Sequence, residues 1–288
     1  MDAGIIISGL GTGAVYGLIA LAYFLFTRAT KAVNFAIGAF VMFAAMLSAY
    51  LVTVAEVPVA LATLLALGAG IALVWLAEAG VLRPIMARTT DEFGAVMAIV
   101  ALMFVLEQLA GILFTRRPLV GKPFVDGIIL VGDSFIEYHT ILVLAVTVLV
   151  FAAVDLWLRK GRYGRMLRAV GDNEAAARVL GLPVRRAKGV AMVCTGLVCA
   201  VAGVLVVSYT PVNFHSSIGF AILGFVAFVI GGMGNAWAPL AGGLILGVIE
   251  ALSAYLLGGG ARDYVLLALV LVIFTVRPQG LFHIEVRL

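Results

Sequence analysis

The stretch "IIISGLGTGAVYGLIALAYFLF", residues 5–26, contains 22 residues and no charged side chain. An α-helix needs about 20 consecutive apolar residues to cross the hydrocarbon core of a bilayer. Inside a bilayer the backbone N–H and C=O groups must bond to one another, and a helix satisfies them within one segment. The stretch therefore predicts a helix that spans a membrane.

Similar apolar runs recur along almost the whole chain. Of its 288 residues, 64% are hydrophobic and 12% are charged, whereas soluble domains are about 25% charged. The predicted segments are residues 5–26, 33–54, 59–82, 94–114, 141–158, 189–209, 216–232, 238–257 and 264–276. The strongly apolar parts of the seventh and ninth, 218–230 and 264–276, are short enough to be re-entrant. We expect an all-α polytopic membrane protein with seven to nine transmembrane or re-entrant helices.

The polar insertions are too short to form separate domains. The longest are residues 115–140 and 159–188, and a chain below about 40 residues seldom builds its own core. We therefore expect residues 1–288 to form a single transmembrane domain. The start "MDAGII" lacks the basic region of a secretory signal, so we expect it to stay as part of the first helix.

The distribution of Lys and Arg predicts the orientation, because these residues accumulate in cytoplasmic loops. With the N-terminus outside, 15 of the 19 basic residues lie inside, and the four outside are Arg116, Arg117, Lys122 and Arg262. If both short segments are re-entrant, only the loop near Arg262 changes side. We expect an external N-terminus and a cytoplasmic C-terminus in the plasma (inner) membrane. Anionic lipid accounts for the net charge of +4, so no nucleic-acid partner is expected.

The most basic predicted loop, residues 159–188, contains the signals of a short helix. They are an N-cap, an acidic first turn, a good helical run, a left-handed C-terminal position and a proline stop: Asp172 or Asn173, Glu174, residues 175–180, Gly181 and Pro183. A linker that only satisfies the positive-inside rule is the alternative. Linkers seldom need start and stop signals so close together, so we interpret the segment as a helix that docks on a cytoplasmic partner.

The chain lacks the phosphate-binding loop of an ATPase. The only Gly-Lys pair, Gly121-Lys122, is followed by Pro123 and does not fit G-x-x-x-x-G-K-[ST]. We therefore expect neither an enzyme nor a cofactor or metal bound by this chain. An ion-driven carrier would be expected to bury an array of charged groups, and few candidates exist. A self-contained secondary carrier or channel is the alternative function.

Two carboxylates and a neighbouring amide lie well inside predicted spans: Glu107, Glu250 and Gln108. A carboxylate at the centre of a membrane helix costs about 2.5–3.5 kcal/mol, so it is seldom kept there without a use. One interpretation is that these groups join helices to one another or to a partner subunit by hydrogen bonds. The other is that they line the route of a transported solute.

A face of small residues runs along the first predicted span. Gly9, Gly13 and Gly17 recur every fourth residue and lie on one side of a helix. This GxxxG-like spacing indicates close packing against another helix. Tyr16 lies beside that face, either as a packing aromatic or as a residue of a solute pathway.

Four stretches of the sequence occur in an order that is known from one family. They are "YGLIALAYFLFTRATKAVNFAIGAF", "RAVGDNEAAARVLGL", "GGMGNAWAPLAGGLILGVIEAL" and "RPQGLF", and all four lie within residues 9–282. In these motifs the chain resembles the permease subunits of branched-chain amino-acid ABC importers, the LivH-type family. The resemblance implies an ATP-driven importer in which this chain is the membrane permease.

The resemblance also implies partners and roles. The short loop helix would be the coupling helix that sits in a groove of an ATPase subunit, formed by Asp172, Asn173, Glu174, Ala175, Ala176, Arg178, Leu180 and Gly181. The implied partners are a second homologous permease, two ATP-binding subunits that hold ATP and Mg²⁺, and an external solute-binding protein.

The second predicted span begins with "NFAIGAF". If it is helical from its first residue, Asn34, Ile37 and Gly38 lie on one face. The resemblance places these residues, with Phe35, at the substrate pathway, and a helix-capping role for Asn34 is the alternative. The usual family pattern is NFAHGE, so Ile37 and Ala39 replace a histidine and a glutamate. We expect a branched-chain or other hydrophobic amino acid, or a related amide or carboxylate, as the solute.

Overall fold

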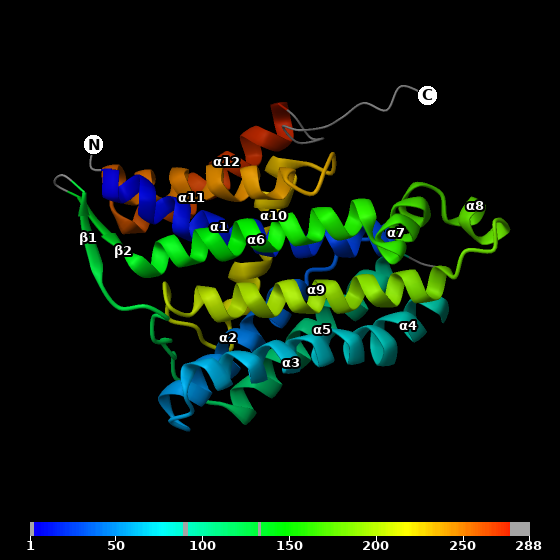
Figure 1. Cartoon of the computed structure of the whole chain (residues 1–288), viewed down its shortest axis with the longest axis horizontal. Coiled ribbons are helices and arrows are strands. Elements are labelled where there is room, and N and C mark those ends of the chain that lie inside the picture. The colour runs from blue at the N-terminus through cyan, green and yellow to red at the C-terminus, as the bar shows by residue number, and fades with distance from the viewer. Residues whose placement is uncertain (1–2, 89–91, 132–133, 277–288) are drawn as a thin grey trace.

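Long helices dominate the computed structural model, which describes residues 3–88, 92–131 and 134–276 (Figure 1). The α-helices are α1 (Ala3–Thr30), α2 (Ile37–Thr53), α3 (Val59–Ala77), α4 (Arg83–Arg88), α5 (Glu92–Leu113), α6 (Tyr138–Lys160), α7 (Arg162–Asp172), α8 (Glu174–Val179), α9 (Val184–Val206), α10 (Ser216–Gly231), α11 (Ala238–Leu257) and α12 (Arg262–Val276). A π-helical turn, η1 (Glu78–Leu82), joins α3 to α4, and a 3-10 turn, η2 (Gly259–Ala261), precedes α12. The motif "RPQGLF" lies outside the described residues.

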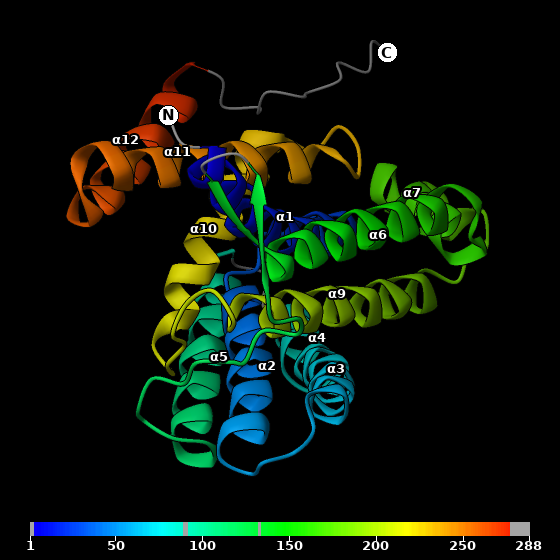
Figure 2. The same cartoon turned by 60° about the vertical axis from the view of Figure 1, so that its left-hand side comes forward.

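Helix α1 forms the centre of the bundle. Residues 13–27 are all buried, as expected for a helix that is apolar on every side. Helices α9, α10 and α11 pack around it, and Figure 1 shows α6, α9 and α11 running beside it. In Figure 2, α2, α5 and α10 are steeply inclined to α6 and α9.

The described residues contain six helices that are long and apolar enough to cross a membrane: Gly4–Thr30, Val59–Ile85, Val96–Leu113, Tyr138–Lys160, Val184–Val206 and Ala238–Leu257. Helices α2, α10 and α12 have 17, 16 and 15 residues, fewer than the about 20 that a perpendicular span needs. The predicted class, an all-α polytopic membrane protein, is confirmed.

The predicted glycine face packs against α11. A Cβ atom added at Gly9 would lie 2.8 Å from the carbonyl oxygen of Gly247, and one at Gly13 would lie 2.6 Å from that of Gly243. No side chain fits at such distances, so the backbones of α1 and α11 touch. This confirms the packing role that the spacing indicated.

The structure corrects the start of the second predicted span. Helix α2 begins at Ile37, and the residues before it form a break in which Lys31 has a φ of 63°. Asn34 accepts a hydrogen bond from the N–H of Ala36 at 2.9 Å through its side-chain oxygen. Such a local turn competes with the helix. Asn34 therefore does not share a helical face with Ile37 and Gly38.

Two polar insertions contain elements that were not predicted. In residues 115–140, β1 (Ile128–Val131) and β2 (Ser134–Glu137) pair antiparallel, with Ile128 opposite Glu137. In residues 159–188, α7 precedes the expected short helix. The β1–β2 sheet and α8 lie at opposite ends of the molecule (Figure 1).

Candidate functional site

Helix α8 is the short helix that the capping signals predicted. The side-chain oxygen of Asn173 accepts a hydrogen bond from the N–H of Ala176 at 3.0 Å, so Asn173, rather than Asp172, is the N-cap. After the helix, Gly181 has a φ of 74°, a left-handed conformation that glycine adopts without strain. Local sequence thus determines both ends of α8.

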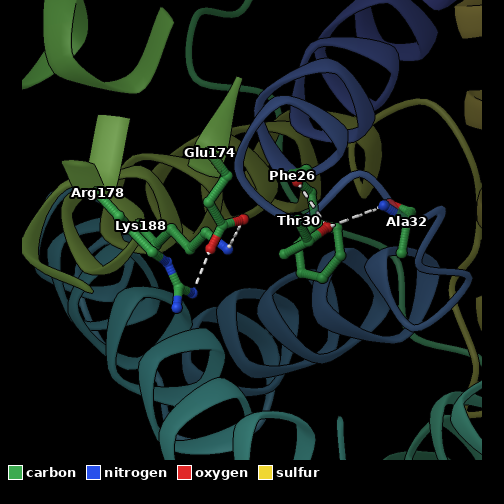
Figure 3. Close-up of polar contacts among 6 residues, drawn as sticks. All are labelled: Phe26, Thr30, Ala32, Glu174, Arg178 and Lys188. Carbon is green, nitrogen blue, oxygen red and sulfur yellow. Dashed lines mark hydrogen bonds and ion pairs between the residues drawn. The ribbon is translucent and has the colours of Figure 1, made fainter. Parts of the chain in front are cut away.

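Glu174 fixes α8 to the following long helix. Its carboxylate accepts a hydrogen bond from Arg178 at 2.6 Å, within α8, and one from Lys188 of α9 at 2.8 Å (Figure 3). The hydrogen bond from Lys188 is the main reason that the pKa of Glu174 lies below its ordinary value, and Arg178 lowers the pKa further. The carboxylate is therefore charged at neutral pH, and both pairs are present.

The outer surface of α8 is exposed and partly apolar. Of its residues, only Ala177 is buried, while Val179 is 88% exposed and the following Leu180 is 77% exposed. Ala175, Ala176 and Arg178 are exposed as well. Two adjacent apolar side chains are therefore exposed at the end of this capped helix.

Helix α7 connects α8 to the central helix. Asp172, its last residue, lies 3.8 Å from the guanidinium of Arg28 near the end of α1. The same guanidinium donates a hydrogen bond to the carbonyl oxygen of Met233, in the segment between α10 and α11. Arg28 of α1 therefore contacts both the end of α7 and the segment between α10 and α11.

Glu250 lies in the seam between α1 and α11. It is 8% exposed, and one of its carboxylate oxygens accepts a hydrogen bond from the hydroxyl of Tyr16 at 3.2 Å. Two of the predicted pathway residues therefore bond to each other across the most extensive helix contact of the bundle.

Glu107 has different neighbours. It lies on α5, is 1% exposed, and accepts a hydrogen bond from the hydroxyl of Ser217 in the first turn of α10. Its second oxygen is 3.8 Å from Nδ1 of His215, an exposed residue just before α10. The adjacent Gln108 is exposed, so the two neighbouring polar residues point in different directions.

The NFAIG motif, residues 34–38, ends in the first turn of α2 and is mostly buried. Asn34 and Ile37 are 0% exposed, and a Cβ atom at Gly38 would collide with the backbone of Ser217 and Ala221 on α10. Phe35 is partly buried and packs edge-on against Tyr23, with ring centroids 6.5 Å apart. The amide nitrogen of Asn34 has no hydrogen-bond partner among the described residues.

The structure thus brings two of the predicted pathway residues, Gly38 and Glu107, to the same residue of α10, Ser217. The Tyr16–Glu250 pair lies apart from them, in the seam between α1 and α11. Sequence reasoning missed the partners Ser217, His215 and Lys188. Ser217 is 110 residues from Glu107, and no local signal connects them. Among the described residues, no three His, Cys, Asp or Glu side chains are grouped so that they could hold a metal ion.

The fold and the site together define a class of protein. A bundle of membrane-length helices with buried polar pairs and an exposed, capped helix at one end is a multi-pass membrane protein. A sequence profile described as "Branched-chain amino acid transport system / permease component" matches residues 5–275. The chain belongs to this family of membrane permeases.

Characterised relatives are similar along nearly their whole length. The LivH permease of the high-affinity branched-chain amino acid transport system of Salmonella typhimurium is 28% identical over 95% of this chain and 93% of that protein. The corresponding BraD permease of Pseudomonas aeruginosa is 28% identical over 96% of this chain and 94% of that protein.

The fold is also similar to a solved structure, that of PsaBC from Streptococcus pneumoniae in complex with a Fab. The match has a TM-score of 0.50 and 14% sequence identity, and it covers 94% of this chain and 91% of the other. At this identity the similarity concerns the fold alone.

Proposed function

We propose that this chain is the permease subunit of an ATP-driven ABC importer, which passes a small solute from an external solute-binding protein into the cytoplasm. It acts with a second homologous permease and two ATP-binding subunits that hold ATP and Mg²⁺. The solute of this proposal is a branched-chain or other hydrophobic amino acid, or a related amide or carboxylate. The names of the relatives support the first of these, a branched-chain amino acid.

The exposed tip of α8 carries this proposal. Val179 and Leu180 expose apolar surface. They belong to the α8 end of the molecule, opposite the β1–β2 sheet (Figure 1). The Glu174–Lys188 pair joins this tip to α9, and the Asp172–Arg28 pair joins α7 to α1. An ATP-binding subunit that moves α8 would therefore act on helices that span the membrane.

The proposed orientation places α8 in the cytoplasm, the N-terminus outside and the C-terminus inside, in the inner membrane. The 15 of 19 basic residues assigned to the inner side support this orientation. Arg28 and Arg83 border cavities at the α7–α8 end of the bundle, in agreement with it.

The docking role is tested with Leu180→Asp in the tagged permease, coexpressed with its ATP-binding subunits. A charge in the centre of an apolar docking surface costs about 2 kcal/mol or more, so recovery of those subunits should fall at least about tenfold. The matched control is Val120→Asp, which changes a 52% exposed side chain in the segment after α5, far from α8.

Equal recovery with Leu180→Asp and with the parent would refute docking through α8. Ion-driven solute uptake by this chain alone in liposomes would instead establish the secondary carrier.

A further inference from the structure

A cavity of about 560 Å³ borders α8 on the side that faces the bundle. Its walls come from α8, from the ends of α1 and α9 nearest to α8, and from η1 and the first residue of α4. In Figure 3, Glu174, Arg178 and Lys188 lie on one side, across from Phe26 and Thr30 of α1. The volume is within the roughly 300–1,000 Å³ of sites that bind small molecules.

Basic side chains outnumber acidic side chains in the lining of this cavity. It is lined by four basic residues, Arg83, Arg178, Arg185 and Lys188, and by two carboxylates, Glu78 and Glu174. Arg83 pairs with Glu78, while Glu174 takes both Arg178 and Lys188. Among the described residues, Arg185 forms no salt bridge. Its guanidinium therefore has donors available for an anion.

The cavity lies at the depth where apolar spans end. Its residues occupy the ends of the membrane-length segments Gly4–Thr30, Val59–Ile85 and Val184–Val206. On α3, Trp75 is 49% exposed, three residues before Glu78. Tryptophan is enriched at the level of the lipid headgroups, which supports this depth for the cavity.

Part of the lining is apolar. Phe26, Leu82 and Val184 contribute to the same cavity as the basic groups. A soluble anion would use only the donors, whereas an amphiphile with an anionic headgroup uses both kinds of surface. Basic pockets between membrane helices are known to bind phospholipid headgroups.

We propose that this cavity binds the phosphate-bearing headgroup of an anionic phospholipid, with Arg185 as the principal cationic contact. The bound lipid would fill the space between α8, the end of α1 and the η1–α4 segment. Lipid binding by the permease needs no ATP-binding subunit, so this proposal can be tested independently of the proposed transport function.

The neighbouring Arg186 offers a matched control. It is exposed in the first turn of the same helix but does not line the cavity. The full-length permease is purified in detergent, and retained lipid is measured by native mass spectrometry after addition of phosphatidylglycerol or phosphatidylcholine. Arg185→Gln should reduce retained phosphatidylglycerol about fivefold, whereas Arg186→Gln should change it by less than about twofold. The parent should retain little phosphatidylcholine.

Unchanged melting temperatures of both variants establish that each remains folded. Equal losses in Arg185→Gln and Arg186→Gln would assign the binding to general surface charge and overturn the proposal. Retention of phosphatidylcholine as strong as that of phosphatidylglycerol would also overturn it. Displacement of the lipid by millimolar inorganic phosphate would identify a soluble-anion site instead. Loss of the lipid when ATP-binding subunits are added would assign the cavity to their docking surface.

Discussion

Glu107 and Glu250 are both carboxylates in apolar helices, yet their surroundings differ. Glu250 accepts its hydrogen bond from Tyr16 where the backbones of α1 and α11 touch. Glu107 lies beside the first turn of α10, and its neighbour His215 has a 65% exposed side chain. We infer that Glu250 joins two helices, whereas Glu107 lies close to a surface that a solute could reach.

The role of Glu250 is tested by removing its charge while keeping its shape. Glu250→Gln retains an acceptor for the Tyr16 hydroxyl, so solute uptake should stay within about twofold of the parent. Glu250→Leu removes this buried acceptor and should lower the free energy of unfolding by about 1–3 kcal/mol. Uptake is measured in reconstituted vesicles and stability by denaturation in detergent. A tenfold loss of uptake in stably folded Glu250→Gln would show that the charge itself acts in transport.

The helices and strands differ in whether neighbouring residues or distant contacts determine them. Helix α8 could be predicted because its start and stop depend on Asn173 and Gly181, which act on their own neighbours. Helix α7 was not predicted, although its sequence carries a helical signal: Leu167 and Val170 lie three residues apart, as on one face of a helix, and both are buried. The β1–β2 sheet depends on the pairing of two strands, which no short sequence pattern predicted.

The cap of α8 provides a graded test of coupling. Asn173→Ala removes the side-chain hydrogen bond to Ala176 and should destabilise α8 by about 1 kcal/mol. The solute transported per ATP hydrolysed should then fall by up to about fivefold, because α8 would be ordered less often. Asn173→Asp, which caps as well as asparagine, serves as the control. If Asn173→Asp lost as much coupling as Asn173→Ala, the effect would not come from the cap.

For the whole molecule, hydropathy identified the apolar segments but not how they meet. The inclination of α2, α5 and α10 to the other helices is not encoded in their apolar length (Figure 2). The site depends on contacts such as Tyr16–Glu250, which are 234 residues apart. The glycine spacing of α1 predicted a close helix contact, but it did not indicate that α11 was the partner.

The α1–α11 seam connects the start of the chain to its last third, so its integrity should control the stability of the whole bundle. An added methyl group at Gly13 would lie 2.6 Å from the carbonyl oxygen of Gly243, and backbone atoms cannot move aside as a flexible side chain can. Gly13→Ala should therefore lower the free energy of unfolding by about 1–3 kcal/mol, the usual cost of overpacking.

Gly68 of α3 is the matched control, because no heavy atom of a neighbour lies within 4 Å of an added Cβ atom there. Gly68→Ala should leave stability unchanged or raise it by up to about 1 kcal/mol, since alanine is the better helix former. Both variants are unfolded by heating in detergent, and each is compared with the parent at the same detergent concentration. The comparison isolates the seam, because the two substitutions add the same methyl group to a membrane helix. If Gly13→Ala melted at the same temperature as Gly68→Ala, the close approach of α1 and α11 would not be what holds the bundle together.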